Sequence, residues 1–555
     1  MKHSNRISAL HRKITGNQKL LFSLCVISLA LPNVFLFFTE RVPFVVGLCN
    51  VVLPVSVLWL IMTLNRRPGK IYLLMFPLVF FAAFQIVLLY LFGNSVIAVD
   101  MFLNLTTTNS IEAGELLSNI MYAIIFVAIV YIPLLLWSIY SLFQEPINDN
   151  FRIWNRKYAV TGCIIGAVLL VVSYATYDKF RVEDDLYPVN VLYNVGLAVD
   201  RTIKVKNYPD TSRDFEFAAR SVREASEKEI HILLIGETAR ADNFGLYGYS
   251  RNTTPMLETV PNLVVFSDAM SQSNTTHKSV PMIMSAVSVE NFNDIYHHKS
   301  IITAFKEAGY STAFYSNQRP NHSFVDFFGA EAHDCRFVKK DMNANTNVSD
   351  DILIELLRTF IDDNDSMKKF IVLHSYGSHF DYSERYPANM SYFKPDKITS
   401  AKPENREILL NAYDNTIRAT DAFIYRLIKM IEAERCVSTI TYLSDHGEDI
   451  YDDDRNLFLH SSPIPTIYQL RVPFLIWTST EYDSLYPEKR LALLKNVDKP
   501  VSSNLSAFHT IIDLAGIETR YFHAIRALSS EDYISDEPRL YLNDHNRPVS
   551  IEEIL

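Results

Sequence analysis

The stretch STITYLSDHGE, Ser438 to Glu448, is an apolar, β-rich run that ends in an acid, an imidazole and a glycine. Side chains on a strand point alternately to opposite faces, so Asp445 and His446 share a side only where the strand has ended. Gly447 supplies the backbone freedom to turn there. One carboxylate and one imidazole suit zinc, or manganese where more oxygen ligands join. The stretch predicts a strand that ends at a metal site, although such a pair also occurs as surface or capping residues.

A second patch, GETAR from Gly236 to Arg240, follows another apolar run, Ile230 to Ile235. Glu237 in this patch is a candidate third metal ligand. The alternative is an acid at a helix N-terminus that pairs with Arg240. Open α/β sheets bind ligands outside the carboxyl ends of their strands, which favours the metal interpretation.

The third patch, NTTHKSVP, runs from Asn274 to Pro281, and Thr276 within it is the candidate nucleophile. The polar, hydroxyl-rich segment predicts a turn and a helix start that aims backbone N–H groups at an anion. A threonine hydroxyl is a poor nucleophile at neutral pH, and coordination to a divalent metal lowers its pKa. The alternative is that Thr275, Thr276 and Ser279 only cap a helix.

Beyond residue 228, strand-like runs alternate with helical patterns, which predicts a single soluble α/β domain over residues 229–555. Residues 178–228 form a charged bridging segment with apolar residues at helical spacing. This segment fits either an interfacial helix on a membrane or an ordinary helix packed on the domain. The predicted strands are Ile230 to Ile235, Leu263 to Phe266, Ser311 to Tyr315, Phe370 to Leu373, Ser438 to Leu443 and Val472 to Trp477.

Residues 1–177 contain five almost uncharged apolar runs, each close to the ~20 residues that a membrane-spanning helix requires. Five such runs followed by none favour a transmembrane domain over buried helices of a soluble protein. The runs are Leu20 to Phe38, Pro43 to Leu64, Ile71 to Phe92, Ile120 to Leu142 and Ala159 to Ala175.

Basic residues predict the orientation of these spans. Eleven Lys and Arg lie before the first span and in the loops after the second and fourth spans, against Arg41 alone in the opposite loops. The positive-inside bias puts the N-terminus in the cytoplasm and everything beyond Tyr177 outside. A net charge of -10 argues against nucleic acid as a partner. Only Cys335 and Cys436 lie outside the spans, so at most one disulfide forms there.

The patches GETAR, T-x-x-S-V-P, HSYGSH, NAYDN and SDHGE, in this order behind five spans, resemble the lipid A phosphoethanolamine transferases, which include the mobile colistin-resistance enzymes. The resemblance implies an alkaline phosphatase or sulfatase-like fold for the soluble domain. It also implies a zinc ion bound by Glu237, Thr276, Asp445 and His446. The family usually has several disulfides in this domain, which this chain lacks.

The resemblance assigns further roles. His379, in HSYGSH, and His460, in FLHSSP, correspond to histidines that contact the substrate phosphate or transfer a proton. His374 is a weaker candidate for the same role. Three membrane-half residues match the N-x-x-x-T-x-x-x-E motif and would bind an ethanolamine headgroup or the acceptor; they are Asn104, Thr108 and Glu112. Asn317 corresponds to the family's W-x-x-N asparagine, and Lys278 or Arg319 takes the place of its basic phosphate contact.

Together these features predict a zinc-dependent or manganese-dependent enzyme in the bacterial inner membrane with its catalytic domain in the periplasm. It would transfer phosphoethanolamine from phosphatidylethanolamine, through a covalent Thr276 intermediate, to a lipid A phosphate or a related envelope acceptor. The alternatives are transfer to another envelope glycan and a manganese-dependent phosphoglycerol transferase. A sulfatase-like hydrolase fits less well, because residues 279–283 lack the C/S-x-P-x-R signature.

Overall fold

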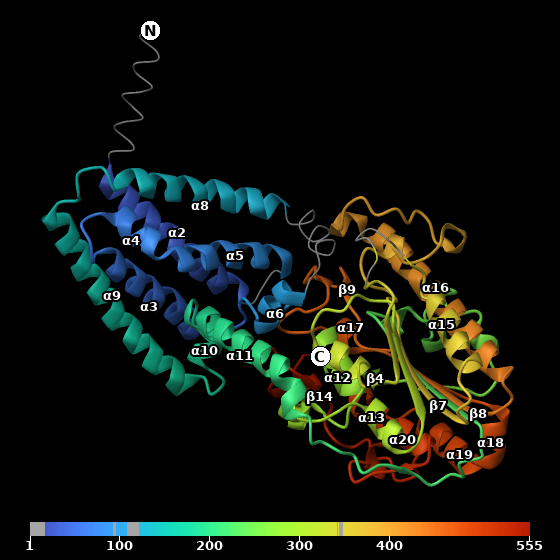
Figure 1. Ribbon diagram of the computed structural model, residues 1–555. Coiled ribbons are helices and arrows are strands. Elements are labelled where there is room, and N and C mark those ends of the chain that lie inside the picture. The colour runs from blue at the N-terminus through green and yellow to red at the C-terminus, as the bar shows by residue number, and fades with distance from the viewer. Residues whose placement is uncertain (1–16, 93–95, 108–120, 341, 343–347, 555) are drawn as a thin grey trace. The chain divides into compact units, whose positions relative to one another are not determined.

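The computed structural model describes residues 17–92, 96–107, 121–340, 342 and 348–554 (Figure 1). The chain divides into two compact units. The first comprises Met1–Phe102 and Leu116–Val199, and the second comprises Leu103–Glu115 and Asp200–Leu555.

The first unit is helical throughout its described residues. Its helices, of which α6 and α11 continue into the second unit, are α2 (Gln18–Thr39), α3 (Phe44–Met62), α4 (Pro68–Leu74), α5 (Phe76–Phe92), α6 (Val99–Thr107), α8 (Met121–Ser141), α9 (Asp149–Thr176), α10 (Val182–Asp185) and α11 (Val189–Thr211).

Among the described residues, four helices are long and apolar enough to cross a membrane: α2, α3, α8 and α9. The pair α4 and α5 makes a fifth span if it is counted as one, although the two helices are bent by 70°. The expected third span is therefore broken at Met75. Pro77 lies in the first turn of α5, where its missing N–H and fixed φ favour the start of a new helix.

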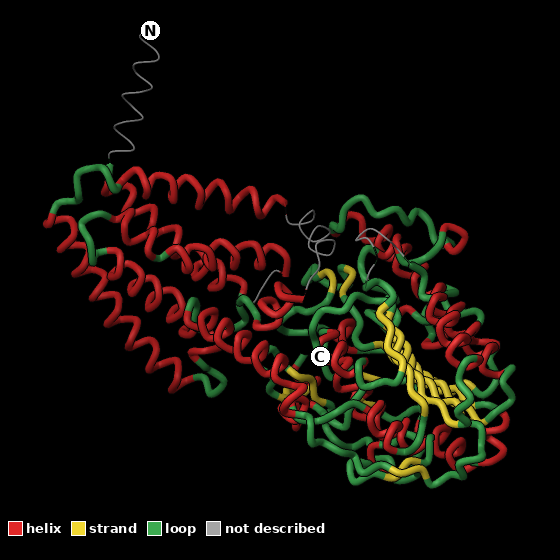
Figure 2. Tube along the Cα trace, in the orientation of Figure 1, coloured by secondary structure: helices red, strands yellow, loops and turns green. Residues whose placement is uncertain are grey.

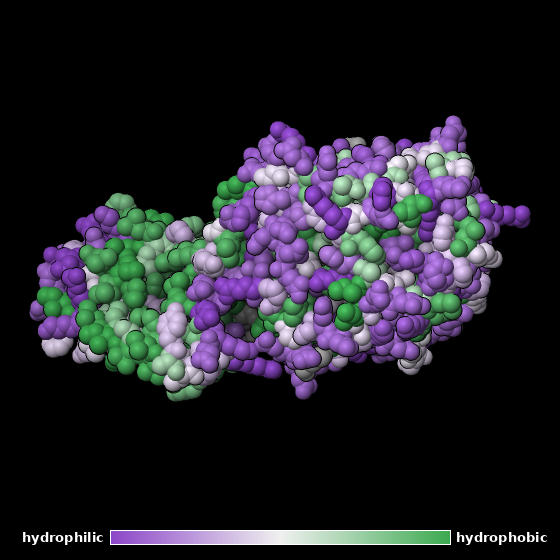
Figure 3. Space-filling model, turned by 90° about the horizontal axis from the view of Figure 1, so that it is seen from below, coloured by the Kyte–Doolittle hydropathy of each residue, from purple (hydrophilic) through white to green (hydrophobic). Residues whose placement is uncertain are grey.

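The surface of the first unit is what a lipid-facing helical bundle requires. Ile27, Ile129, Ile164 and Val171 are each more than half exposed. On the face shown in Figure 3, hydrophobic side chains gather over these helices, whereas the surface of the second unit is mainly hydrophilic. In water such a surface would be unfavourable, so this unit is a membrane domain.

The second unit is built on a seven-stranded sheet in the order β3-β11-β8-β2-β7-β5-β6. The strands β8, β2, β7, β5 and β6 are mutually parallel, whereas β11 runs antiparallel to its neighbours. Their bounds are β2 (Glu229–Gly236), β3 (Leu263–Val265), β5 (Ser311–Ser316), β6 (Asp334–Phe337), β7 (Lys368–His374), β8 (Val437–Ser444) and β11 (Phe474–Thr478).

Helices cover both faces of this sheet (Figures 1 and 2). Successive residues of β2 point to opposite faces, so that Leu233 and Ile235 join one hydrophobic core and Ile232 and Leu234 join the other. The remaining helices are α12 (Thr276–Ile283), α13 (Ile301–Glu307), α14 (Phe324–Gly329), α15 (Asp351–Asp362), α16 (Arg406–Glu432), α17 (Ile467–Leu470), α18 (Thr480–Leu485), α19 (Pro487–Asn496) and α20 (Ser503–Leu514).

Four two-stranded sheets complete the unit. They pair β1 (Arg220–Ser221) with β13 (Ile517–Glu518), β4 (Ala269–Met270) with β12 (Val501–Ser502), β9 (Asp449–Ile450) with β10 (Phe458–Leu459), and β14 (Leu540–Leu542) with β15 (Pro548–Ser550).

The predicted α/β fold is confirmed, and each of the six predicted runs overlaps a strand of the large sheet. The one strand of the large sheet that the sequence did not predict is β6, at the edge of the sheet, where no residue is fully buried. Its sequence DCRF carries two charged residues among four, so it lacks the apolar run by which the other strands were recognised.

Cys335 and Cys436 are both free thiols. Cys335 lies on β6 and Cys436 directly precedes β8, and three strands separate β6 from β8 in the sheet. With neighbouring strands about 4.8 Å apart, the separation is roughly 19 Å. A disulfide requires the two Cα atoms to lie within about 7 Å, so these cysteines do not pair with each other.

Close packing in the first unit is clearest between α3 and α9. A Cβ atom placed on Gly166 of α9 would lie 2.6 Å from the Cα of Leu53 in α3. Gly162, one turn earlier, faces Ser56 in the same way. Two glycines at this spacing let helix backbones approach closely in a membrane, where packing rather than the hydrophobic effect drives association.

We expect Gly166→Val to lower the free energy of unfolding of the helical unit by about 1–3 kcal/mol, because the added methyl groups must separate the two helices. Thermal unfolding in detergent would measure the loss. Ala167→Val is the matched control, since Ala167 is exposed on the same helix. Equal stability of the two variants would contradict a close α3–α9 contact at Gly166.

Candidate active site

The carboxyl ends of β2 and β8 place two of the predicted site residues side by side. Gly236 pairs with Ser444 in the parallel ladder. The ladder continues for one more bond, in which the Asp445 N–H donates to the Gly236 carbonyl at 3.0 Å. Glu237 and Asp445 therefore leave the sheet at the same level.

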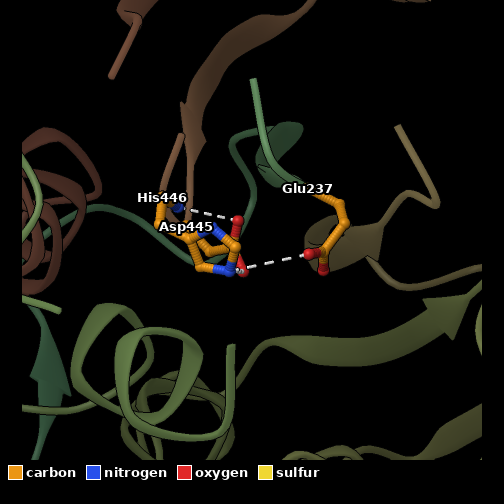
Figure 4. A group of neighbouring side chains, drawn as sticks. All are labelled: Glu237, Asp445 and His446. Atoms are coloured by element: carbon orange, nitrogen blue, oxygen red, sulfur yellow. Dashed lines mark hydrogen bonds and ion pairs between the residues drawn. The ribbon is translucent and has the colours of Figure 1, made fainter. Parts of the chain in front are cut away.

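Glu237, Asp445 and His446 form a group in which one potential ligand atom of each residue lies within 4.8 Å of the others (Figure 4). His446 Nε2 lies 3.2 Å from Asp445 Oδ2 and 3.7 Å from Glu237 Oε1. None of the three side chains is more than 1% exposed. The potential ligand atoms therefore surround a common centre that is shielded from water, as expected of a metal centre at the end of a sheet.

Hydrogen bonds determine which atoms face the centre of this group. Asp445 Oδ1 accepts from the N–H groups of Thr238 and His446, at 3.1 and 2.7 Å. Asp445 Oδ2 is buried and has no hydrogen-bond partner among the described residues. His446 Nδ1 lies 2.9 Å from the Gly447 carbonyl, which only accepts, so Nδ1 carries the proton and Nε2 presents a lone pair. The lone pairs of Asp445 Oδ2 and His446 Nε2, which lie 3.2 Å apart, repel each other unless a cation lies between them. The residues therefore fit a bound metal ion.

The electrostatics agree with this conclusion. Burial, with the neighbouring Asp445 carboxylate, raises the pKa of Glu237 well above its usual value. Burial likewise raises the pKa of Asp445 to about 6 and lowers that of His446 well below its usual value. The site therefore disfavours two free carboxylates, and a divalent cation would restore both of them to the charged form.

The backbone around the group is strained and closely packed. Thr238, directly after Glu237, has a φ of 54°, which is unusual for a β-branched residue. Its carbonyl accepts from the Tyr413 hydroxyl at 2.7 Å, which fixes this conformation. Gly447 is not in the left-handed region, contrary to the expected turn; a Cβ there would lie 2.3 Å from the Tyr468 carbonyl oxygen. A glycine is therefore needed at position 447 so that the backbone of Tyr468 can approach the chain there.

Thr276 is the first residue of α12, and its hydroxyl faces the group. Its Oγ1 lies 3.2 Å from Glu237 Oε1 and 3.1 Å from His446 Nε2. The hydroxyl has one proton for two acceptors, so one of these contacts is satisfied only if a cation is shared. The capping alternative finds no support at Thr275, the N-cap, which makes no side-chain capping bond. Ser279 donates to the Asp445 carbonyl at 2.6 Å instead.

The three predicted histidines lie around this group at different depths. The His460 ring is centred 4.3 Å from the His446 ring and 6.2 Å from the His379 ring. His379 Nδ1 lies 2.7 Å from the Phe380 carbonyl. His374 is buried behind the group, with Nε2 4.0 Å from Glu237 Oε2. His460 and His379 therefore lie beside the group and His374 lies against Glu237; their contact with a substrate stays a prediction.

Two residues of the site were not among the predicted site residues. Gln318 donates through Nε2 to Glu237 Oε2 at 2.9 Å, and Glu448 Oε2 lies 3.5 Å from His460 Nδ1. Glu448 is fully buried. Its position in SDHGE was a usable signal, because Glu448 lies only two residues after His446. Gln318 had no such signal beyond its place after β5.

The three polar residues predicted to contact the substrate phosphate form hydrogen bonds within the protein. The Asn317 amide donates to the Val348 carbonyl and to Asp350, at 2.9 and 2.8 Å. Lys278 donates to the Asn543 carbonyl at 3.2 Å, and Arg319 donates to the Met342 carbonyl at 2.9 Å. Their roles as substrate contacts stay predictions.

The positively charged side chains of Lys339 and Arg385 act electrostatically on His379. Lys339 Nζ lies 3.3 Å from the centre of the Tyr376 ring, and the Arg385 guanidinium lies 4.1 Å from it. The Tyr376 ring in turn stacks on His379 at 5.2 Å. Burial and Arg385 together lower the pKa of His379 to about 3, so this imidazole is neutral at physiological pH. The sequence pattern pointed to neither cation.

Of the predicted substrate residues in the membrane half, Thr108 and Glu112 lie outside the described residues. Asn104 is described only as part of the backbone of α6. The predicted contact of these three residues with a headgroup or acceptor stays a prediction.

A family model described as Sulfatase matches residues 230–517, just over half of the chain. The match contains the sheet and every residue of the metal group, and the chain belongs to the sulfatase family.

Among curated relatives, phosphoethanolamine transferase EptA of Escherichia coli (strain K12) is 30% identical over 313 residues, which are 54% of this chain and 55% of that protein. The match therefore spans about half the length of that relative. The Kdo(2)-lipid A phosphoethanolamine 7''-transferase of Salmonella typhimurium (strain LT2) is 25% identical over 425 residues, 70% of this chain and 72% of that protein.

Solved structures extend the likeness of the fold to both units. The integral membrane protein lipooligosaccharide phosphoethanolamine transferase A (EptA) from Neisseria meningitidis superposes with a TM-score of 0.66 at 20% identity, covering 90% of this chain and 98% of that chain. The periplasmic domain of EcEptC from Escherichia coli, in complex with Zn, gives a TM-score of 0.55 at 24% identity, covering 60% of this chain and 95% of that chain.

We expect Asp445→Asn to reduce the affinity for a divalent cation by about tenfold or more, because it removes a charged ligand whose free oxygen faces the centre. Metal content of the purified full-length protein, measured by plasma mass spectrometry after dialysis, would report the loss. Asp421→Asn is the matched control: Asp421 is also a buried carboxylate, but it accepts from the Met256 and Leu257 N–H groups. Unchanged metal content in Asp445→Asn would show that the group does not bind metal.

Proposed function

We propose that this protein transfers phosphoethanolamine from phosphatidylethanolamine to a lipid A phosphate through a covalent Thr276 intermediate. The observation that carries the proposal is the position of Thr276 Oγ1, 3.2 Å from Glu237 Oε1 and 3.1 Å from His446 Nε2. A hydroxyl at the edge of a buried ligand group is the arrangement that metal-activated phosphoryl transfer requires. The names of the relatives, which are phosphoethanolamine transferases and include a lipid A enzyme, support the choice of donor group and acceptor.

Glu237, Asp445 and His446, with Thr276 Oγ1, would hold a zinc ion, and the donor set also admits manganese. Such an ion would lower the pKa of the Thr276 hydroxyl and offset charge on the phosphoryl oxygens. The solved complex of the EcEptC domain with Zn supports this choice of metal.

The reaction has two displacements at one phosphorus atom. Thr276 Oγ1 attacks the phosphorus of the donor, the bond from phosphorus to the glycerol oxygen breaks, and the proton that leaves the Thr276 hydroxyl ends on the oxygen of the departing diacylglycerol. An acceptor phosphate oxygen then attacks the same phosphorus, the bond to Thr276 Oγ1 breaks, and the proton that the acceptor phosphate group loses restores the hydroxyl. Positioning and charge stabilisation supply most of the rate enhancement in such transfers.

We assign His460 and His379 to the phosphoryl oxygens and the proton transfers. Both rings lie beside the metal group. His379 Nδ1 donates to the Phe380 carbonyl, so the neutral ring presents the lone pair of Nε2 and can accept a proton; it donates to a phosphoryl oxygen only after it has taken that proton up. Glu448 would hold His460 in one orientation through Nδ1, at 3.5 Å. Lys339 and Arg385 add positive charge on the His379 side.

We further propose that the catalytic domain, residues 229–555, lies in the periplasm above the bacterial inner membrane, with residues 178–228 as the bridge. The support is the distribution of basic residues, because Arg66, Arg67 and Lys70 separate α3 from α5, and Arg152, Arg156 and Lys157 open α9. With the positive-inside bias these loops are cytoplasmic, and the chain beyond the last span is outside.

We expect Thr276→Ala to abolish transfer, with a loss of about three orders of magnitude or more, because it removes the hydroxyl that lies beside Glu237 and His446. The assay is release of labelled headgroup from phosphatidylethanolamine, together with mass spectrometry of lipid A from cells that carry the chain. Thr276→Ser keeps a hydroxyl and should retain partial activity. Full activity of Thr276→Ala in a folded protein would exclude the covalent route. Release of labelled headgroup only from phosphatidylglycerol would instead favour a phosphoglycerol transferase.

We expect Glu448→Gln to lower kcat by about tenfold with little change in KM, because the loss of the carboxylate frees the His460 ring to rotate. The pH dependence of kcat should change as well, which a merely structural effect would not produce. In a His460→Ala background the same substitution should have no further effect. Two independent, additive losses would contradict a role for Glu448 through His460.

A further inference from the structure

An apolar pocket lies in the second unit beside the start of α12, apart from the metal group. Its volume is about 400 Å³, within the range of sites that hold small molecules. It is bounded by α11, α12, α14 and the short helix η4 (Val289–Tyr296). Its apolar lining consists of Leu103, Val205, Phe292, Tyr296, Phe324 and Phe327.

The wall of this pocket is preformed. The Tyr296 and Phe324 rings lie 5.5 Å apart, and the Tyr208 ring packs behind Phe324 and Phe327 at 5.3 and 5.5 Å. The Tyr208 hydroxyl in turn donates to the His298 carbonyl or to Glu331, each at 3.0 Å. Aromatic rings that pack closely on one another and on a hydrogen-bonded tyrosine leave little room for collapse, so we expect the pocket to keep its volume without a ligand.

The pocket also has positively charged residues on its lining. Arg201 and Lys206 from α11 and Lys278 from α12 all contribute to it. Arg201 and Lys278 are positioned by the backbone carbonyls of Asp544 and Asn543, at 2.7 and 3.2 Å. An aromatic interior with cationic groups complements a molecule that has a hydrocarbon tail and an anionic head.

The pocket begins close to the nucleophile in the chain. His277 and Lys278, which line it, are the two residues that follow Thr276 in α12. A ligand whose anionic end meets Lys278 therefore has that end two residues along α12 from Thr276.

We propose that this pocket binds one acyl chain of the phospholipid donor, an inference that rests on the proposed function. In a phospholipid donor the glycerol that carries the acyl chains is bonded directly to the phosphate. In the acceptor a sugar ring separates the phosphate from the acyl chains. A hydrocarbon site that begins one residue from the nucleophile fits the donor, since only the donor brings an acyl chain that close to the reacting phosphorus.

Photochemical crosslinking tests this assignment without turnover. Full-length Thr276→Ala protein in nanodiscs would be irradiated with phosphatidylethanolamine that carries a diazirine on one acyl chain, and the adducts mapped by mass spectrometry. We expect adducts on residues 201–206 and 321–327. The same label on a lipid A acyl chain should leave these segments unmodified. Adducts from lipid A but not from phosphatidylethanolamine would overturn the assignment in favour of the acceptor, and adducts from neither would overturn the pocket as a lipid site.

Val205→Trp fills the pocket and tests the same claim by kinetics. We expect it to raise the KM for dipalmitoyl phosphatidylethanolamine by about tenfold or more, because excluding two methylenes from an apolar site already has that effect. Turnover of glycerophosphoethanolamine, which has no acyl chains, should be unchanged. Thr202→Trp, at an exposed position of the lining, is a second variant in case Val205→Trp fails to fold.

Ile203→Trp is the matched control, because Ile203 is 53% exposed on the same helix and does not line the pocket. An equal KM for the wild type and both pocket variants would overturn the proposal. Headgroup release from no donor at all, by the wild type, would instead refute the proposed function. Loss of activity toward both the acylated and the chain-free donor would show a general defect and would also count against a role in chain binding.

Discussion

The convergence of Asp445 Oδ2, Glu237 and His446 Nε2 in a water-excluded corner is the constraint on which the catalytic unit depends. Two carboxylates and an imidazole lone pair within 4.8 Å of one another are unfavourable unless a cation shares them. The chain meets this constraint with hydrogen bonds that leave each inward atom free: Asp445 Oδ1 and His446 Nδ1 are both bonded outward. The group is thus organised for an ion before any ion binds, and Thr276, the proposed nucleophile, lies within 3.2 Å of two of its members.

The parallel register of the sheet makes this arrangement possible. Because Gly236 pairs with Ser444, the residues that follow emerge at one level, although they are more than 200 positions apart in the chain. Ladder bonds and a hydrophobic core on each face hold β2 and β8 rigid, so ligand positions are set by the sheet and not by loops. The strained backbone at Thr238 shows the same dependence, since its φ of 54° persists only between Asp445 and the Tyr413 hydroxyl.

What could be predicted from the sequence follows from this architecture. Apolar runs revealed the central strands because both faces of those strands are buried, and the residues after β2 and β8 could be assigned to one site by the rule for strand ends. The edge strand β6 carried no such pattern. Asn317 and Gln318 show a second limit: both follow β5, and which one faces Glu237 depends on how the chain turns after the strand, which no short-range pattern encodes. Predicting the break at Met75 would have required knowing that Pro77 lies in the first turn of a new helix. A hydropathy value is an average over the whole apolar run, so it does not detect such a break.

The metal group and the apolar pocket rest on different parts of the fold, and this separation has a consequence for specificity. The ligands Glu237, Asp445 and His446 follow strands of the sheet, whereas most apolar side chains of the pocket come from α11, η4 and α14, which pack on one hydrophobic core. Among the described helices, only α12 contributes to both, through Thr276 and through Lys278. Substitutions in Val205 or Phe327 change a surface of that core without moving the strand ends, because the ladder fixes Gly236 against Ser444. Lipid preference can therefore change while the phosphoryl chemistry stays the same, which is how one family fold serves different substrates. In this protein the chemistry resides in the sheet, and we infer that the choice of lipid resides in the helices beside it.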